Sequence, residues 1–145
     1  MKLNIYNDPL NQITLGQEDL IDFPYGIPGF EDLKKYAIVP IDGHDPFKLL
    51  HSVENMDIAL ILIESKFLRL ENEVKIPMTD LNGVGAKNEQ DIITYVIVKI
   101  TDGGRRITGN TRAPIVVNSN RRKGRQLILD RSDLAVDHLI AEREN

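Results

Sequence analysis

The chain has 145 residues, of which 41% are apolar, and 18 Lys and Arg side chains oppose 22 Asp and Glu side chains for a net charge of -4. A chain of this size typically buries about 70% of its unfolded surface, so we expect one domain over residues 1–145. A charged fraction of 28% without a low-complexity run argues against disorder. The mild acidity argues against a protein that acts mainly on nucleic acid or anionic lipid.

The absence of cysteine excludes disulfide scaffolds, thiolate nucleophiles, iron–sulfur clusters and zinc fingers. Residues 1–12 contain no apolar stretch long enough for a signal peptide. The longest apolar run, residues 58–63, is far shorter than the roughly 20 residues that a membrane helix needs. The sequence therefore predicts a cytoplasmic protein without a membrane partner.

Short apolar runs separated by turn residues predict strands along almost the whole chain. We expect these strands at residues 4–6, 12–15, 20–23, 36–41, 47–52, 58–64, 92–101, 106–111, 115–118 and 126–129. The connections contain Gly, Pro, Asn and Asp, the residues that fix or permit turn dihedrals. Residues 92–111 form a hairpin with a Gly-rich loop in this interpretation, and residues 115–129 form a second hairpin around a basic loop.

The C-terminal segment has a different pattern. Ser132 or Asp133 can cap a short helix in which Val136, Leu139 and Ile140 share one face. The predicted fold class is therefore all-β, mainly an antiparallel barrel or sandwich, with a short C-terminal α-helix.

Two predicted strands, at residues 58–63 and 92–100, are apolar on both faces. A half-exposed antiparallel strand alternates apolar and polar residues, so something must cover the second face. Either another part of this chain covers it, a helix or a second sheet, or a partner protein does.

The sequence contains no recognisable catalytic or metal-binding pattern. His44, His51 and His138 lie in separate segments, and Asp42 and Asp45 beside His44 fit an ordinary polar turn better than a cation site. No serine has a G-x-S-x-G context. Residues 81–87 (LNGVGAK) lack both phosphate-loop spacings. We expect no enzyme, no cofactor and no metal.

Basic residues concentrate between residues 101 and 125. Seven Arg and Lys residues oppose only Asp102 there, which gives the segment a net charge of about +6 and the remainder about -10. Three interpretations remain open: a solvated hairpin, a patch for an acidic protein surface, or a nucleic-acid-binding β-barrel that uses the basic hairpin 105–125. Aromatic residues for base stacking are absent from this segment.

Three stretches carry a family resemblance. They are FPYGIPGFE at residues 23–31, LHSVE at residues 50–54, and ITGNTRAPIVVN followed by GRQLIL at residues 107–118 and 124–129. In this order they resemble the FliW family of bacterial flagellar assembly factors. His51 and Thr111 stand where Gln and Leu are usual in the family, and Glu64-Ser65 where Pro is frequent.

The matched residues have structural explanations of their own. Gly and Pro fix turns, Pro114 suits a strand start or edge, and Asn side chains bond to turn backbone. We expect a structural role for the whole family signature, namely Phe23, Pro24, Gly26, Pro28, Gly29, Phe30, Asn110, Pro114, Asn118 and Gln126.

The resemblance implies a single FliW-like β domain without catalytic activity. Its implied partners are flagellin, whose terminal segments are amphipathic and prone to form helices, and CsrA, the RNA-binding translational repressor. A helix lying in an apolar groove on strands 58–63 and 92–100 is one plausible contact, and direct binding of nucleic acid is not expected. For the charged contact we select Arg105, Arg112, Arg121 and Arg122.

Overall fold

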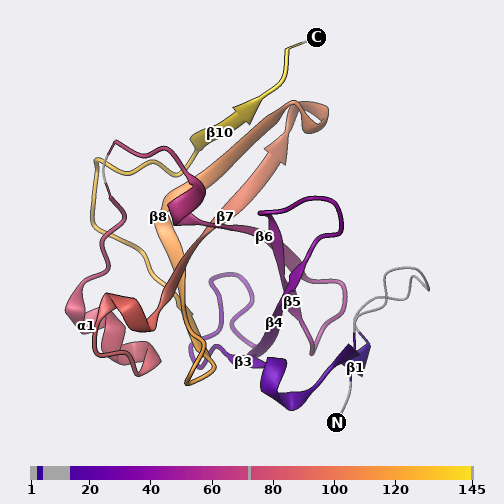
Figure 1. Ribbon diagram of the computed structural model, residues 1–145, viewed down its shortest axis with the longest axis vertical. Coiled ribbons are helices and arrows are strands. Elements are labelled where there is room, and N and C mark those ends of the chain that lie inside the picture. The colour runs from indigo at the N-terminus through magenta and orange to yellow at the C-terminus, as the bar shows by residue number, and fades with distance from the viewer. Residues whose placement is uncertain (1–2, 5–13, 72, 145) are drawn as a thin grey trace.

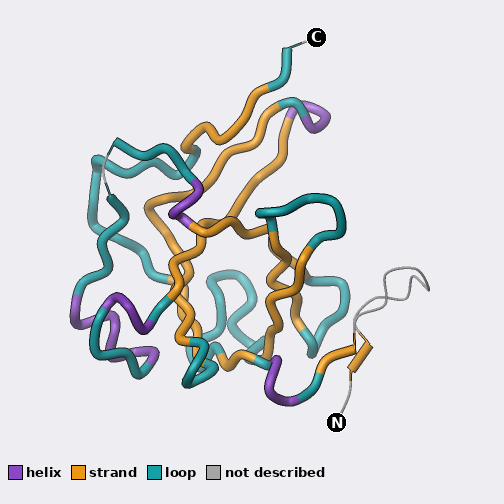
Figure 2. Tube along the Cα trace, in the orientation of Figure 1, coloured by secondary structure: helices purple, strands orange, loops and turns teal. Residues whose placement is uncertain are grey.

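A computed structural model describes residues 3–4, 14–71 and 73–144, and it is built almost entirely from strands (Figures 1 and 2). A two-stranded ribbon joins β1 (Leu3–Asn4) to β2 (Thr14–Leu15). The main sheet contains β3 (Ile21–Asp22), β4 (Lys35–Pro40), β5 (Lys48–Ser52), β6 (Ala59–Glu64), β7 (Ile93–Thr101), β8 (Arg106–Asn118), β9 (Lys123–Gln126) and β10 (His138–Glu142). The helix α1 (Met78–Leu81) and five short 3-10 turns, at Gln17–Asp19, Ser65–Phe67, Asn82–Val84, Glu89–Asp91 and Asp102–Gly104, lie in the connections.

Seven of these strands close into a barrel. The order β8-β7-β6-β5-β4-β3-β9 returns to its start because β9 also pairs with β8. All pairings are antiparallel except that of β3 with β9, in which Asp22 lies opposite Lys123. Figure 2 shows the strands as a ring in this view. β10 adds to β8 outside the ring and points away from it (Figure 1).

The barrel interior is filled by side chains from every wall. Phe23, Tyr36, Leu50, Leu62 and Ile115 have no exposed surface. The rings of Phe23 and Tyr36 meet edge to face with centroids 5.1 Å apart. Such filling leaves the barrel a packed core without a channel.

The outer faces of the strands are covered by other parts of the chain. Ile63, Val96 and Val98 pack outside β6 and β7 with Phe47, Leu68, Ile107 and Ile140. Val116 packs outside β8 with residues of the connection between β6 and β7, among them Ile76, Leu81 and Val84. The two-sided apolar strands are thus explained mainly by the chain itself, through loops and β10. Ile100 remains 49% exposed at the end of β7.

The all-β class is confirmed, whereas the C-terminal helix is wrong. Residues 131–137 form turns and β10 follows as a strand that pairs with residues 106–109 of β8. A register shift between Leu139 and Ala141 lets Ile140 pack on the core while Leu139 stays exposed. The spacing of Val136, Leu139 and Ile140 fits a helix, but tertiary pairing with β8 decides the conformation.

Most predicted strands match within one or two residues, with two corrections. The strands expected at 106–111 and 115–118 are one long strand, β8. The strand expected at 126–129 begins earlier, as β9, and shares only Gln126 with the prediction. Residues 5, 6, 12 and 13 of the first two predicted strands lie outside the described residues.

β8 is continuous because it contains a wide bulge. Tyr95 pairs with Ile115 but Ile97 pairs with Asn110, so the four residues 111–114 of β8 lie opposite the single residue Val96 of β7. A bulge of this kind bends and twists its strand. Here the later part of β8 belongs to the barrel, and its earlier part lies between β7 and β10 in the extension above the barrel (Figure 1).

We predict that Gly124→Ala destabilises the barrel. A Cβ at Gly124 would lie 2.5 Å from Cζ of the buried Phe23 ring, and neither the ring nor β9 has space to move. Overpacking of this kind costs about 1–3 kcal/mol of the free energy of unfolding, measured by urea denaturation. Gly16→Ala is the control, because its Cβ would meet only the flexible end of the Glu18 side chain. Equal stability of the two variants would contradict the prediction.

Candidate functional site

The stretch 23–31 forms a tight turn at the start of the barrel. Gly26 and Gly29 have φ values of 67° and 92°, in the region where only glycine is unstrained. A Cβ at Gly26 would lie 2.6 Å from the backbone of Glu31. The Gly29 N–H donates to the Glu31 carboxylate over 3.1 Å, and chiefly this bond lowers the pKa of Glu31. The two glycines and the Glu31 side chain therefore fix this turn.

The stretch 50–54 holds the residues that follow this turn. The Glu54 carboxylate accepts the N–H groups of Lys34 and Lys35, and the Ser52 hydroxyl accepts those of Glu54 and Asn55. His51, 5% exposed, places Nδ1 2.8 Å from the carbonyl oxygen of Ser52. This motif too is occupied by contacts within the fold.

The bulge of β8 is held by the third motif. Asn110 Oδ1 accepts the N–H groups of Arg112 and Ala113, both over 3.1 Å. Gln126 Nε2 donates to the carbonyl of Ala113. The carbonyl of Pro114 accepts the N–H of Leu127 over 2.8 Å. Side chains and backbone thus take the hydrogen bonds that the bulge removes from the β7–β8 ladder.

Asn118 connects two loops at the end of β8. Its buried side chain donates from Nδ2 to the Val84 carbonyl over 3.0 Å, and its Oδ1 accepts the Arg121 N–H over 3.2 Å. The β8–β9 turn and the 3-10 turn Asn82–Val84 are therefore fixed relative to each other.

The structure does not bring the four selected arginines together. Arg105 precedes β8 while Arg121 and Arg122 follow it, and a strand of 13 residues spans on the order of 40 Å. Arg112 lies between them, at the bulge. The basic segment of the sequence is consequently split into separate places rather than folded into one ribbon.

Arg112 clamps the segment that leads into β10. Its Nη2 and Nε donate to the Leu134 carbonyl over 2.7 and 3.1 Å. The neighbouring Thr111 exchanges hydrogen bonds with the N–H and carbonyl of Ala135. Within the same segment the Arg131 side chain donates to the Asp133 carboxylate. This hydrogen bond is the main cause that lowers the pKa of Asp133.

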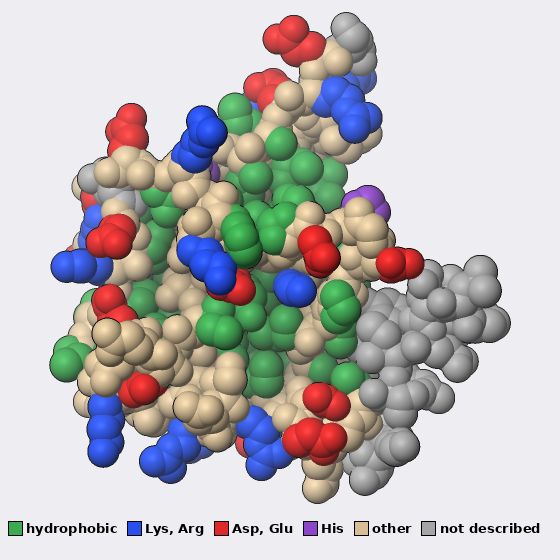
Figure 3. Space-filling view, viewed as in Figure 1, with side chains coloured by type: hydrophobic (Ala, Val, Ile, Leu, Met, Phe, Trp, Pro, Cys, Tyr) green, Lys and Arg blue, Asp and Glu red, His purple; other side chains and the backbone are tan. Residues whose placement is uncertain are grey.

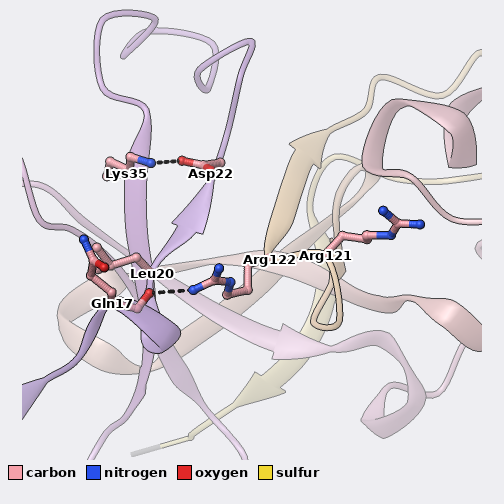
Figure 4. Close-up of a pocket in the computed structure, with 6 residues that line it drawn as sticks. All are labelled: Gln17, Leu20, Asp22, Lys35, Arg121 and Arg122. Carbon is pink, nitrogen blue, oxygen red and sulfur yellow. Dashed lines mark hydrogen bonds and ion pairs between the residues drawn. The ribbon is translucent and has the colours of Figure 1, made fainter.

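A basic surface surrounds the β8–β9 turn. Arg122 has a positive φ of 54° and donates from Nη1 to the Gln17 carbonyl over 3.0 Å. Figure 4 shows Arg121 pointing the opposite way, away from Arg122 and the Asp22–Lys35 ion pair. Two hollows of about 210 and 200 Å³ share Arg121 as a lining residue. Diverging side chains form a broad cationic surface and do not enclose a single small anion.

A second surface lies beside β10. Two hollows of about 320 and 280 Å³ share Arg69 and His138, between residues 67–71 and residues 133–140. Phe67 and Leu139 line the second one and are 52% and 44% exposed. We call this the β10 groove. In Figure 3, hydrophobic side chains gather in the middle of the visible face and towards β10, and charged side chains are scattered around them.

The residues considered for enzyme chemistry lie apart. His51 is buried in β5, His138 lines the β10 groove, and His44 is in an exposed loop where Asp45 faces Lys48 at 3.9 Å. Among the described residues, no three His, Asp or Glu side chains are placed to hold a metal ion. No helix in that part of the chain is long and apolar enough to span a membrane.

Sequence reasoning missed the place of four residues on these surfaces: the exposed Tyr25, Phe67 and Leu139, and the half-buried Arg125. Tyr25 was interpreted only as part of a turn motif, and Leu139 as part of a helix. Arg125 was counted in the basic segment, but its partner, Tyr25, is distant in the sequence. Only the folded chain places the Arg125 guanidinium 4.6 Å from the centre of the Tyr25 ring.

Comparison with known proteins gives a consistent result. Residues 4–140 match the family model described as FliW protein. A flagellar assembly factor FliW from Clostridium botulinum (strain Alaska E43) is 37% identical over 130 residues, which cover 90% of this chain and 92% of that protein. One from Thermotoga maritima is 32% identical over 139 residues, covering 95% and 93%.

The fold comparison agrees with the sequence comparison. A crystal structure of the flagellar assembly factor FliW superposes with a TM-score of 0.85 and 28% identity, and the match covers 100% of both chains.

We predict that Arg112→Ala loosens β10 and lowers stability. Loss of a charged group that donates twice to the Leu134 carbonyl costs about 2 kcal/mol, and the amides of β10 exchange hydrogen faster because their anchor is lost. Hydrogen exchange by NMR and urea denaturation measure both effects. Arg105→Ala is the control, since among the described residues its side chain makes no ion pair or hydrogen bond. Unchanged β10 protection in Arg112→Ala would refute the clamp.

Proposed function

The chain belongs to the FliW family of flagellar assembly factors, and we propose that it acts in the cytoplasm, without catalysis, by binding flagellin and by antagonising CsrA. The observation that carries the proposal is the match along nearly the whole chain to proteins named as flagellar assembly factors. The motif side chains support it indirectly: their contacts lie within the fold, so the exposed surfaces remain for partners.

The proposed mechanism is a partition of the protein between two partners. While unexported flagellin is present it occupies the protein, and CsrA is left to repress flagellin synthesis. After export, the protein is released and binds CsrA. This requires only that the two binding equilibria oppose each other, and the coupling must then be reciprocal: each partner weakens the other by the same factor.

For flagellin we propose the β10 groove. Apolar side chains at the edges of a groove with mixed polar lining suit an amphipathic helix, which places its apolar face between them. Phe67 and Leu139 lie on the two sides of this groove. The groove therefore replaces the outer faces of β6 and β7 as the candidate contact, because those faces are largely covered by the chain itself.

We predict that the purified protein binds flagellin and CsrA from the same bacterium in titration calorimetry, and that saturation with one weakens the other. The reason is the linkage above. A flagellin mRNA fragment is the third titrant. Binding to the RNA alone would overturn the proposal and favour a nucleic-acid-binding barrel, and silence towards all three would overturn it as well.

We predict that Phe67→Ser weakens flagellin binding by about tenfold while the melting temperature changes little. Burial of a Phe side chain at an interface is worth roughly 1.5–3 kcal/mol, and 1.4 kcal/mol corresponds to tenfold in affinity. Met78→Ser is the matched control, because Met78 is 66% exposed on α1 and does not line the groove. If the two variants bind flagellin equally, the groove is not the contact.

A further inference from the structure

The surface that carries this inference joins the start of the barrel to the β8–β9 turn. The Tyr25 ring is 60% exposed, and the Arg125 guanidinium lies over it at 4.6 Å. Arg125 also reaches Gly83: a Cβ at that glycine would lie 2.8 Å from its Nη1. A Cβ at Gly85 would lie 3.5 Å from Cγ of Arg121. Tyr25, Arg125 and Arg121 thus follow one another along the turn 82–85, and we call them the Tyr–Arg ridge.

The backbone beneath this ridge is fixed before any partner arrives. Asn118 bonds to both the Val84 carbonyl and the Arg121 N–H. On the other side of the turn, the Arg122 carbonyl accepts the Asp22 N–H over 2.9 Å. Little conformational freedom of the backbone is left to lose on binding, which favours affinity.

The charge of the ridge is not neutralised within the protein. The two arginines of the ridge and the three cations beside it make five: Lys87, Arg121, Arg122, Lys123 and Arg125. Among the described residues, none of them has a carboxylate within ion-pair distance. The Asp91 carboxylate in the same region accepts the backbone N–H groups of Lys87 and Asn88. Positive potential of this kind accelerates encounter with an acidic surface and selects against a basic one.

We propose that the Tyr–Arg ridge binds an acidic segment of a protein partner. Tyr and Arg are the residues that most often dominate interface energies when they sit in fixed positions. A protein is favoured over RNA because the whole chain has a net charge of -4, whereas proteins that act mainly on nucleic acid carry an excess of positive charge. The inference rests on the proposed function, because flagellin or CsrA would supply the acidic segment. It adds to that function a surface and the kind of charge that this surface binds.

The test uses charge reversal on the ridge and at a distant exposed cation. Arg121→Glu and Arg125→Glu each change the charge by the same amount as the control Lys99→Glu, whose exposed side chain lies opposite Thr108 in β7 and outside the ridge. The titrants are flagellin, CsrA, a short poly-L-glutamate peptide and a flagellin mRNA fragment. Unchanged melting temperatures verify folding, and Arg121→Glu removes no side-chain hydrogen bond among the described residues.

We expect Arg121→Glu to weaken one protein partner and poly-L-glutamate by about tenfold, and Tyr25→Ala to weaken the protein partner by about fivefold, while Lys99→Glu leaves both unchanged. Equal affinity of the ridge and control variants for the protein partners overturns the inference and leaves the proposed function intact. If neither protein binds the wild type, the proposed function fails, and the poly-L-glutamate titration then tests the inference on its own. Poly-L-glutamate binding that is lost only in the ridge variants supports the inference. Absence of poly-L-glutamate binding to the wild type overturns it. RNA binding through the same arginines, without poly-L-glutamate binding, also overturns it.

Discussion

Closure of the barrel depends on one close contact, between the ring of Phe23 and the bare backbone of Gly124. β3 and β9 share a single parallel pair of residues, which is little backbone hydrogen bonding for a seam. The Phe23 ring, with no exposed surface, compensates by lying directly on β9 where any side chain would collide with it. The Asp22 N–H bond to the Arg122 carbonyl adds to the seam. Packing therefore closes the barrel where the ladder is shortest.

The same seam determines the geometry of the candidate surfaces. Tyr25 follows Phe23 by two residues, and Arg125 follows Gly124 by one, so the contact that closes the barrel also brings the aromatic ring under the guanidinium. Phe23, Gly26 and Gly29 of the FPYGIPGFE motif make contacts or turns within the fold, whereas Tyr25 lies exposed at the surface. A family motif of this kind need not be the binding site in order to build it.

How far the sequence predicts this molecule depends on whether the deciding interaction is local. The strands from Lys35 to Thr101 follow from apolar runs and turn residues, which act within a few residues. β10 does not, because its helical spacing is overridden by pairing with β8 and by the Arg112 clamp from 22 residues away. The basic segment does not form one patch for the opposite reason. Its residues are close in the sequence, but an extended strand places them far apart in space.

β8 contributes to both proposed surfaces. Its early residues hold β10 and thereby one wall of the β10 groove, its bulge carries Arg112, and its last residue, Asn118, positions Arg121. Both proposed surfaces therefore depend on contacts made by one strand. Opposed binding of two partners then needs no shared contact, only unequal preference for the arrangements of one strand.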